Sequence, residues 1–249
     1  MSWSTLASNA NPNDTNNTFD VFWRGRFDIG PYPNSFALLQ RSSLDTNGTS
    51  LSTSQVIADN NLLLEGVLSP EATIDILIHR KYATNREPLI RLYFAFFHRV
   101  PDAGGLMYWL DKMTAGTTLD QVATSFTTSP EFINTYGSLN NTAFVTLVYH
   151  NVLGRAPDAG GLAHWVSVLG QGATRGSVMT SFSESHEGIG LLRPAVDTIL
   201  VFLAMLRRIP TQSEFTSWFN ALSANNGQPT EILINSLLYT SEYATRVGY

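Results

Sequence analysis

The chain has 249 residues, 43% of them hydrophobic, which is enough to bury a sizeable core. Only 14% are charged and the formal net charge is -5, so there is no basic face of the kind that binds nucleic acid or anionic lipid. The absence of cysteine excludes disulfides, thiolate zinc sites and a cysteine nucleophile. We therefore expect a soluble protein whose core is held by packing alone, with no nucleic-acid partner and no membrane insertion.

The N-terminal residues 1–54 predict a flexible arm followed by an irregular segment. Residues 1–10 lack the cationic run and apolar stretch of a signal peptide, and no segment of about 18 apolar residues predicts a membrane span. Residues 10–18 are almost all Asn, Asp, Thr and Pro, which favour turns. Residues 19–36 mix six aromatic rings with glycine and proline, so this segment either completes the core or grips a neighbouring subunit or a ligand.

A turn is expected over residues 44–53, which contain the order Asp-x-Asn-Gly. This order is similar to part of a calcium loop and makes Asp45 and Asn47 candidate metal ligands, although the acid that should close such a loop is missing. Two helices are predicted next, one over residues 56–67 and one that begins at Pro70. This helical pair is a possible degenerate copy of the repeats that follow it.

A motif occurs three times after residue 88, with the order Arg, any residue, Pro, a polar residue, and Trp seven places on. Its arginines are Arg99, Arg155 and Arg208, and its tryptophans are Trp109, Trp165 and Trp218. Apolar residues recur at helical spacing before each arginine, around each tryptophan and again further along. Each unit therefore predicts three amphipathic helices and a connecting fourth turn, and such units must stack to bury their apolar faces.

Small and hydroxyl residues mark the expected ends of these helices. The second helix of each unit should end at a glycine, namely Gly116, Gly172 and Gly227. The third helix should begin after a capping threonine, namely Thr118, Thr174 and Thr230. The connection that follows begins at a serine close to a glutamate, at Ser129, Ser185 and Ser241.

The acidic residue of the motif invites a functional interpretation as a metal ligand or catalytic acid. Asp102 and Asp158 each lie in a Pro-Asp-Ala-Gly-Gly turn, but the third copy has Thr211 there, with Glu214 three residues later. Threonine replaces aspartate as a helix cap, whereas it does not replace a general acid or a strong calcium ligand. We expect all four residues to be structural caps, so that Asp158→Ala lowers stability without loss of binding.

The arginines and tryptophans are the candidate ligand-binding residues. Each arginine closes a helix, where it can bind the last carbonyl groups or Glu131 and Glu187; recognition of an acidic polysaccharide is the alternative. The tryptophans Trp109, Trp165 and Trp218 lie on apolar stripes, which favours core packing over stacking on a sugar.

The sequence contains no pattern typical of catalysis. Its five histidines form no His-Glu-x-x-His motif, and there is no Gly-x-Ser-x-Gly elbow, phosphate loop or dinucleotide-binding glycine motif. We expect no enzymatic activity and no cofactor, with calcium as the one candidate ion.

Residues 153–165, Leu-Gly-Arg-Ala-Pro-Asp-Ala-Gly-Gly-Leu-Ala-His-Trp, and the later Ser-His-Glu at 185–187 resemble the DUF4214 repeat family. The first copy, with Ser-Pro-Glu-Phe at 129–132, is nearly as similar, and the third replaces the Asp and both glycines. The resemblance implies an all-helical module similar in outline to phycobilisome linker domains. The resemblance also implies that the module belongs to large secreted or surface-associated bacterial proteins, including surface-layer proteins, and that it has no established activity.

We therefore expect an all-α protein of tandem three-helix repeats stacked into one helical body. The expected divisions are residues 1–54, a helical pair at 55–88, and repeats at 89–142, 143–195 and 196–249. The expected function is that of a bacterial extracellular or cell-surface scaffold, which self-assembles in the manner of a surface layer or binds other envelope proteins or an envelope polymer. A carbohydrate-binding module for a polysaccharide is the alternative.

Overall fold

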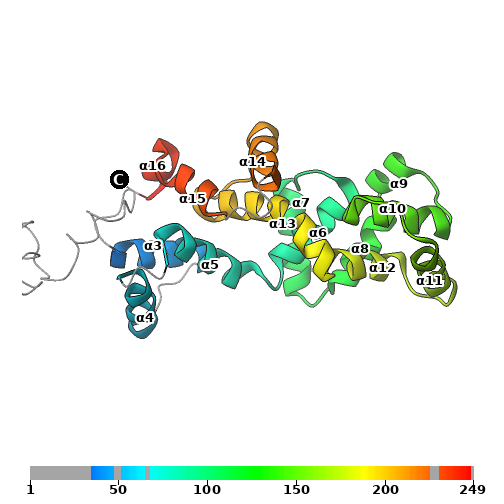
Figure 1. Cartoon of the computed structure of the whole chain (residues 1–249), viewed down its shortest axis with the longest axis horizontal. Coiled ribbons are helices and arrows are strands. Elements are labelled where there is room, and N and C mark those ends of the chain that lie inside the picture. The colour runs from blue at the N-terminus through cyan, green and yellow to red at the C-terminus, as the bar shows by residue number, and fades with distance from the viewer. Residues whose placement is uncertain (1–34, 48–51, 65–67, 225–229, 248–249) are drawn as a thin grey trace, which may run out of the picture. The chain divides into compact units, whose positions relative to one another are not determined.

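The computed structural model describes residues 35–47, 52–64, 68–224 and 230–247, and these residues are all-α, without a strand (Figure 1). In chain order the helices are α3 (Ser35–Asn47), α4 (Thr53–Leu64), α5 (Pro70–Tyr82), α6 (Arg86–Phe97), α7 (Ala103–Thr114), α8 (Leu119–Thr127), α9 (Pro130–Tyr136), α10 (Asn141–Leu153), α11 (Ala159–Gly170), α12 (Arg175–Ser183), α13 (His186–Val201), the π-helical turn η1 (Phe202–Leu206), α14 (Gln212–Ala224), α15 (Glu231–Leu238) and α16 (Ser241–Val247).

The chain divides into two compact units. The first unit contains the described residues up to Lys81, residues 204–206, and the described residues from 230 onward. The second unit contains residues 82–203 and 207–224 of the described chain, and therefore holds the first two motif copies complete.

The apolar stripes predicted for the first and third helices are buried. In the first helix of each copy, nearly every stripe position is inaccessible to solvent, as at Leu92, Val148 and Val201. The third helices bury Val122, Phe126, Val178, Phe182, Ile234 and Leu238. The core of the second unit lies between these first and third helices, because α6 packs against α8, α10, α12 and α13.

The predicted fourth turn of each repeat is a short helix in the structure. It is α9 in the first copy, the start of α13 in the second and α16 in the third. Ser129 and Ser185 cap the first two through bonds from Phe132 N and Gly188 N. In the third copy Thr240, and not Ser241, receives the equivalent bond from the backbone.

Two local predictions were wrong. Thr230 is not a helix cap, because its backbone is already helical and its side chain makes no capping hydrogen bond. Helix α3 was not predicted, and it takes Asp45 and Asn47 into its last turn, where a loop was expected. The flexible arm and most of the aromatic segment 19–36 lie outside the described residues, as does Gly227.

Among the described residues, one helix is long and apolar enough to cross a membrane by length and composition, contrary to the expectation from the sequence. It runs over 21 residues from His186 to Leu206, through α13 and η1. However, 67% of its apolar window is buried inside the structure, and α13 packs against α6, α10, α12 and α14. These contacts are those of the core helix of a folded domain.

The first two copies meet each other at equivalent positions. The side-chain amide of Asn151 donates to the carbonyl of Ala95 at 3.0 Å, and both residues lie four places before their motif arginine. Gly176 lies against the backbone of Asp120, so that a Cβ on the glycine would stand 2.7 Å from the Asp120 carbonyl oxygen. Both of these residues lie two places after their capping threonine. Equivalent surfaces that touch each other indicate an approximate twofold relation between the two copies.

A buried ion pair also joins these copies. Arg91 on α6, whose side chain is only 6% exposed, donates to both carboxylate oxygens of Glu184, at 2.9 and 2.6 Å. Glu87 lies 3.3 Å from the same guanidinium. Although burial opposes the charge on Arg91, its pKa is raised above the ordinary value by the hydrogen bonds and charges of these carboxylates.

Candidate functional site

The recurrent motif forms a junction that is built around the arginine at the end of each first helix. The residue before the arginine adopts the left-handed conformation in all three copies, at His98 (φ 49°), Gly154 (φ 64°) and Arg207 (φ 58°). This conformation ends the helix and turns the chain, as is common at helix C-termini. Glycine tolerates it without cost, whereas histidine and arginine do not.

In the first two copies the arginine binds the glutamate of the fourth helix. Arg99 holds Glu131 through two parallel hydrogen bonds, Nε to Oε1 at 2.5 Å and Nη2 to Oε2 at 2.8 Å. Arg155 holds Glu187 in the same way, with both distances at 3.2 Å. The hydrogen bond from Arg99 lowers the pKa of Glu131, and the pair fastens α9 to the end of α6. The second pair is about half exposed at both side chains.

In the third copy the arginine binds a different glutamate. Arg208 donates through Nη1 and Nη2 to Glu214 at 2.8 and 2.7 Å. Glu214 also accepts from the backbone N–H of Thr211 at 2.7 Å, while the Thr211 hydroxyl accepts from Glu214 N at 3.3 Å. The bonds between Thr211 and Glu214 form a capping box, to which the ion pair with Arg208 is added. The hydrogen bond from Arg208 is the largest cause that lowers the pKa of Glu214 to about 2, and the donors of Thr211 contribute further.

Each motif aspartate is the residue immediately before a helix. Asp102 accepts from Gly105 N at 2.7 Å and Asp158 accepts from Gly161 N at 2.8 Å, so that they are the N-caps of α7 and α11. The hydrogen bond from Gly161 is the main reason that the pKa of Asp158 is lowered. A carboxylate engaged in this way supplies helix stability.

A tyrosine and a glycine complete the junction, and sequence reasoning missed their relation. Tyr93 and Tyr149 lie six places before their arginines, and Gly105 and Gly161 lie six places after. Each tyrosine hydroxyl lies against its glycine, where a Cβ would collide with it. Burial, followed by the charge of Asp102, raises the pKa of Tyr93 to about 12.

The third copy changes both members of this tyrosine–glycine pair at once. It has Phe202, without a hydroxyl, in place of the tyrosine, and Glu214 in place of the glycine. The sequence does carry a signal of this contact, because the residues six places before and six places after the arginine change together in the third copy.

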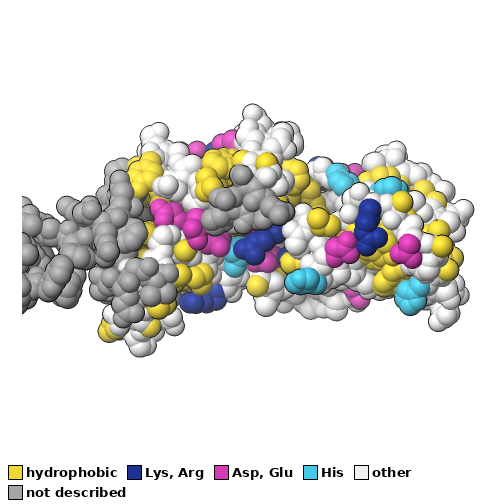
Figure 2. All heavy atoms as spheres, viewed as in Figure 1, with side chains coloured by type: hydrophobic (Ala, Val, Ile, Leu, Met, Phe, Trp, Pro, Cys, Tyr) yellow, Lys and Arg dark blue, Asp and Glu magenta, His cyan; other side chains and the backbone are white. Residues whose placement is uncertain are grey.

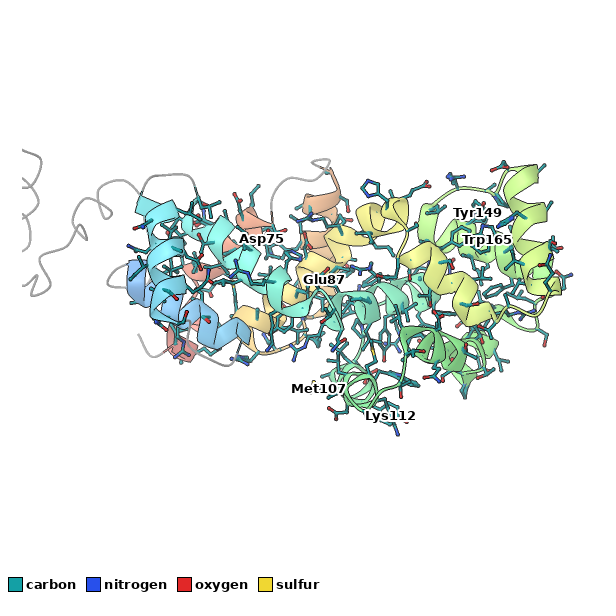
Figure 3. All side chains as sticks on the ribbon, turned by 90° about the horizontal axis from the view of Figure 1, so that it is seen from below. Asp75, Glu87, Met107, Lys112, Tyr149 and Trp165 are labelled. Atoms are coloured by element: carbon teal, nitrogen blue, oxygen red, sulfur yellow. The ribbon has the colours of Figure 1, made fainter. Side chains whose placement is uncertain are left out.

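The tryptophans are half-buried in the second helix of each copy. Trp109 packs edge-on to Phe126 with ring centroids 5.6 Å apart, and its outer neighbour is Tyr108. Trp165 packs on Phe182 at 5.0 Å, and Tyr149 packs on the same ring at 4.8 Å (Figure 3). Trp218 is also half-buried, on α14. Trp109 and Trp165 therefore pack on buried phenylalanine rings while all three tryptophans stay partly accessible.

The candidate residues do not gather into a single centre. Each arginine is engaged within its own copy, and the exposed His150 and His164 lie on different helices, α10 and α11. Within the described ranges, no group of three or more His, Asp or Glu residues could hold a metal ion. Figure 2 shows that, over the described surface on this face, cationic side chains are few and lie close to anionic ones.

Comparison with known proteins identifies the family of the repeats. The DUF4214 family, described as a domain of unknown function, matches residues 78–132 and again residues 123–192. The two matches take in the first and second motif copies and end before the third. No curated protein and no solved structure matches the chain. Residues 78–192, which hold the first two motif copies, therefore match the DUF4214 family.

Proposed function

We propose that the chain is a non-enzymatic scaffold protein of the bacterial cell surface or extracellular space. It acts by self-assembly, or by attachment to other envelope proteins or an envelope polymer. One observation carries this proposal: the polar residues that recur in the motif are used to join helices. Arg99, Arg155 and Arg208 each hold a glutamate within their own copy, and the motif aspartates cap helices. Recurrent residues engaged in this way support a role in architecture and leave few polar groups for a reaction.

The composition supports assembly of many copies. With 14% charged residues and a net charge of -5, two copies can approach each other with little long-range repulsion. The proposed location rests on the resemblance to modules of secreted and surface-associated bacterial proteins. A self-complementary surface joins two subunits into a closed dimer, whereas a head-to-tail contact gives rings or open filaments.

Light scattering coupled to size-exclusion chromatography tests the proposal. The molar mass should rise with protein concentration, and electron micrographs of the concentrated sample should show regular particles or filaments. The same series with and without added calcium tests the prediction that calcium binds at Asp45 and Asn47, since a mass that does not depend on calcium would leave the ion without a role in assembly. A monomer at every concentration, with no binding to cell-wall preparations, would contradict the scaffold.

The second candidate function is carbohydrate binding, which the half-buried tryptophans favour. Trp109 and Trp165 are partly accessible and lie beside the exposed Tyr108 and His164, and such rings can stack on sugars. A glycan array tests it, with Trp109→Leu and Trp165→Leu as variants and Tyr239→Leu, an exposed aromatic residue outside the motif, as the control. Binding by a monomer that is lost in the tryptophan variants, although circular dichroism shows that they remain folded, would replace the scaffold with this function.

A further inference from the structure

The connection from the second copy to the third differs from the connection between the first two copies. In the first connection Gly137 closes α9 and a loop leads to α10. In the second connection the fourth helix continues without a loop into the first helix of the next copy, and the two together are α13. The chain advances 26 residues from Ser129 to Arg155. It advances 23 residues from Ser185 to Arg208, so the second connection is three residues shorter.

Three residues that disfavour a helix lie along α13. Gly188 and Gly190 have low helix propensity, and a Cβ on Gly190 would meet nothing within 4 Å, so no close contact requires a glycine there. Pro194 has no backbone N–H, so the carbonyl of Gly190 lacks the donor that lies four residues on in a regular α-helix. An ion pair crosses this point from Arg193 Nε to Asp197 Oδ2 at 3.2 Å, but the arginine side chain is 58% exposed. The hydrogen-bond ladder of α13 is therefore weakest between residues 190 and 194.

Burial along α13 changes at the same point. After it, Ala195 and Ile199 are at most 1% exposed. Before it, Ile189 and Leu191 are 39% and 51% exposed, and Leu192 is buried at the boundary. The second half of α13 therefore belongs to the core, whereas much of the first half faces solvent.

The first half of α13 also lacks two side chains that hold α9 in the first copy. Phe132 of α9 is buried, and the hydroxyl of Tyr136 donates to the carbonyl of Phe96 at 2.9 Å. Counted from the capping serine of each copy, Gly188 and Leu192 take the places of Phe132 and Tyr136. Neither residue provides an aromatic ring or a side-chain hydrogen bond, so this attachment is weaker in the second copy.

The ion pair that fastens the fourth helix is weaker as well. The two hydrogen bonds of Arg155 with Glu187 are both 3.2 Å long, whereas those of Arg99 with Glu131 are 2.5 and 2.8 Å. Both side chains of the second pair are 49% exposed, against 35% and 41% for the first. An exposed pair contributes little to stability, and salt screens it.

We propose that residues 186–193 form a strap that opens as a local unit about Pro194, while residues 195–201 stay in the core. Unwinding of residues 190–193 then supplies a loop of the kind that already separates α9 from α10. Opening releases the Arg155 guanidinium from Glu187, so the strap is a conformational switch that responds to ionic strength. The strap lies within the second copy and does not depend on the proposed scaffold role.

Amide hydrogen exchange of the full chain, read at single residues by NMR, tests the strap with α9 as the matched control. After correction for intrinsic rates, residues 189–193 should exchange roughly tenfold faster than residues 133–137, which hold the same positions after their capping serine. They should also exchange faster than residues 198–201 of the same helix. Equal protection of 189–193 and 198–201 would show that α13 opens as one piece and would overturn the proposal, as would exchange no faster than that of 133–137.

Three variants test the cause of the opening. Gly190→Ala should slow the exchange of residues 189–193 about two- to fivefold, because alanine favours the helix and its Cβ meets no neighbour. Gly170→Ala on α11, where a Cβ also meets nothing within 4 Å, is the control and should leave these residues unchanged. Glu187→Gln should speed their exchange roughly two- to fivefold at low salt and much less at high salt. The strap is wrong if Gly190→Ala slows residues 198–201 equally, and the switch is wrong if the effect of Glu187→Gln does not vary with salt.

Discussion

The hydroxyl oxygen of Tyr93 lies 2.7 Å from the position that a Cβ would take on Gly105. Asp102 Oδ2 lies 2.9 Å from the same position, so Gly105→Ala should force both the tyrosine ring and the capping carboxylate to shift. The expected net loss is about 1–2 kcal/mol in the free energy of unfolding, because a steric cost of about 1–3 kcal/mol exceeds the better helix propensity of alanine. Urea denaturation followed by circular dichroism measures it.

Gly104 provides the control for this substitution. A Cβ there would meet nothing closer than 3.5 Å, so Gly104→Ala should raise stability by roughly 0.5–1 kcal/mol through helix propensity alone. In a Tyr93→Phe background, which imitates Phe202 of the third copy, the cost of Gly105→Ala should fall, because only the Asp102 carboxylate then crowds the Cβ. An unchanged cost in that background would show that the tyrosine hydroxyl is not the obstacle.

The left-handed residue before each arginine gives a second prediction. His98 has φ 49° at a position where the second copy has Gly154, with φ 64°. His98→Gly should raise the free energy of unfolding by about 1 kcal/mol, because glycine adopts this conformation without the steric cost of a Cβ. Gly154→Ala should lower it by a similar amount. Thermal melts of both variants check this, and a loss of stability in His98→Gly would indicate an undetected role of the imidazole.

Much of the helical framework follows from the sequence, because its signals are local. The apolar spacing before Arg99 and Arg155 predicts α6 and α10, and Asp102 and Asp158 lie at the helix starts that their turns indicate. The sequence predicts only a turn where the short fourth helix lies, because seven residues such as Pro130–Tyr136 are too few to show a helical period.

The remaining features depend on distant parts of the chain. Helix α3 escaped prediction because its sequence, Ser35–Asn47, has no strong apolar stripe and follows a stretch rich in glycine and proline. The partner of Arg91 lies 93 residues away, and no local pattern connects an arginine on α6 to Glu184. Arg208 binds Glu214 where the other two arginines bind a glutamate of the fourth helix, and this difference can be predicted only by comparing the three copies position by position.

The buried pair of Arg91 and Glu184 yields a third prediction. Arg91→Met removes the cation between Glu184 and Glu87, whose side chains are 25% and 14% exposed. The free energy of unfolding should fall by about 3 kcal/mol, as is typical when one partner of a buried ion pair is lost. The double variant Arg91→Met with Glu184→Met should recover most of this loss, because it leaves fewer buried charges uncompensated. Equal losses in the single and double variants would contradict an electrostatic cause.

The exposed pair of Arg155 and Glu187 is the matched comparison for that experiment. Both side chains are 49% exposed, so water already solvates the charges, and Arg155→Met should change the unfolding midpoint far less than Arg91→Met. Raising the salt concentration should weaken the contribution of the exposed pair and leave that of the buried pair nearly unchanged. Chemical denaturation of both variants at low and high salt separates the two cases.

The pKa of Glu214 gives the last prediction, a pH dependence of stability. Because its folded-state pKa is lowered from 4.5 to about 2, the ionised form stabilises the fold. This contribution is complete above about pH 5 and is lost as the pH falls towards 2. Glu214→Gln should therefore lower the free energy of unfolding at pH 6 by on the order of 1 kcal/mol, after discounting for solvent screening of a side chain that is one-third exposed.

Urea midpoints of the wild type and the variant should converge towards pH 2, whereas Ser217→Ala on the same helix should give an offset that does not vary with pH. A constant difference between Glu214→Gln and the wild type from pH 6 to pH 2 would mean that Glu214 contributes through packing, and not through its charge on Arg208.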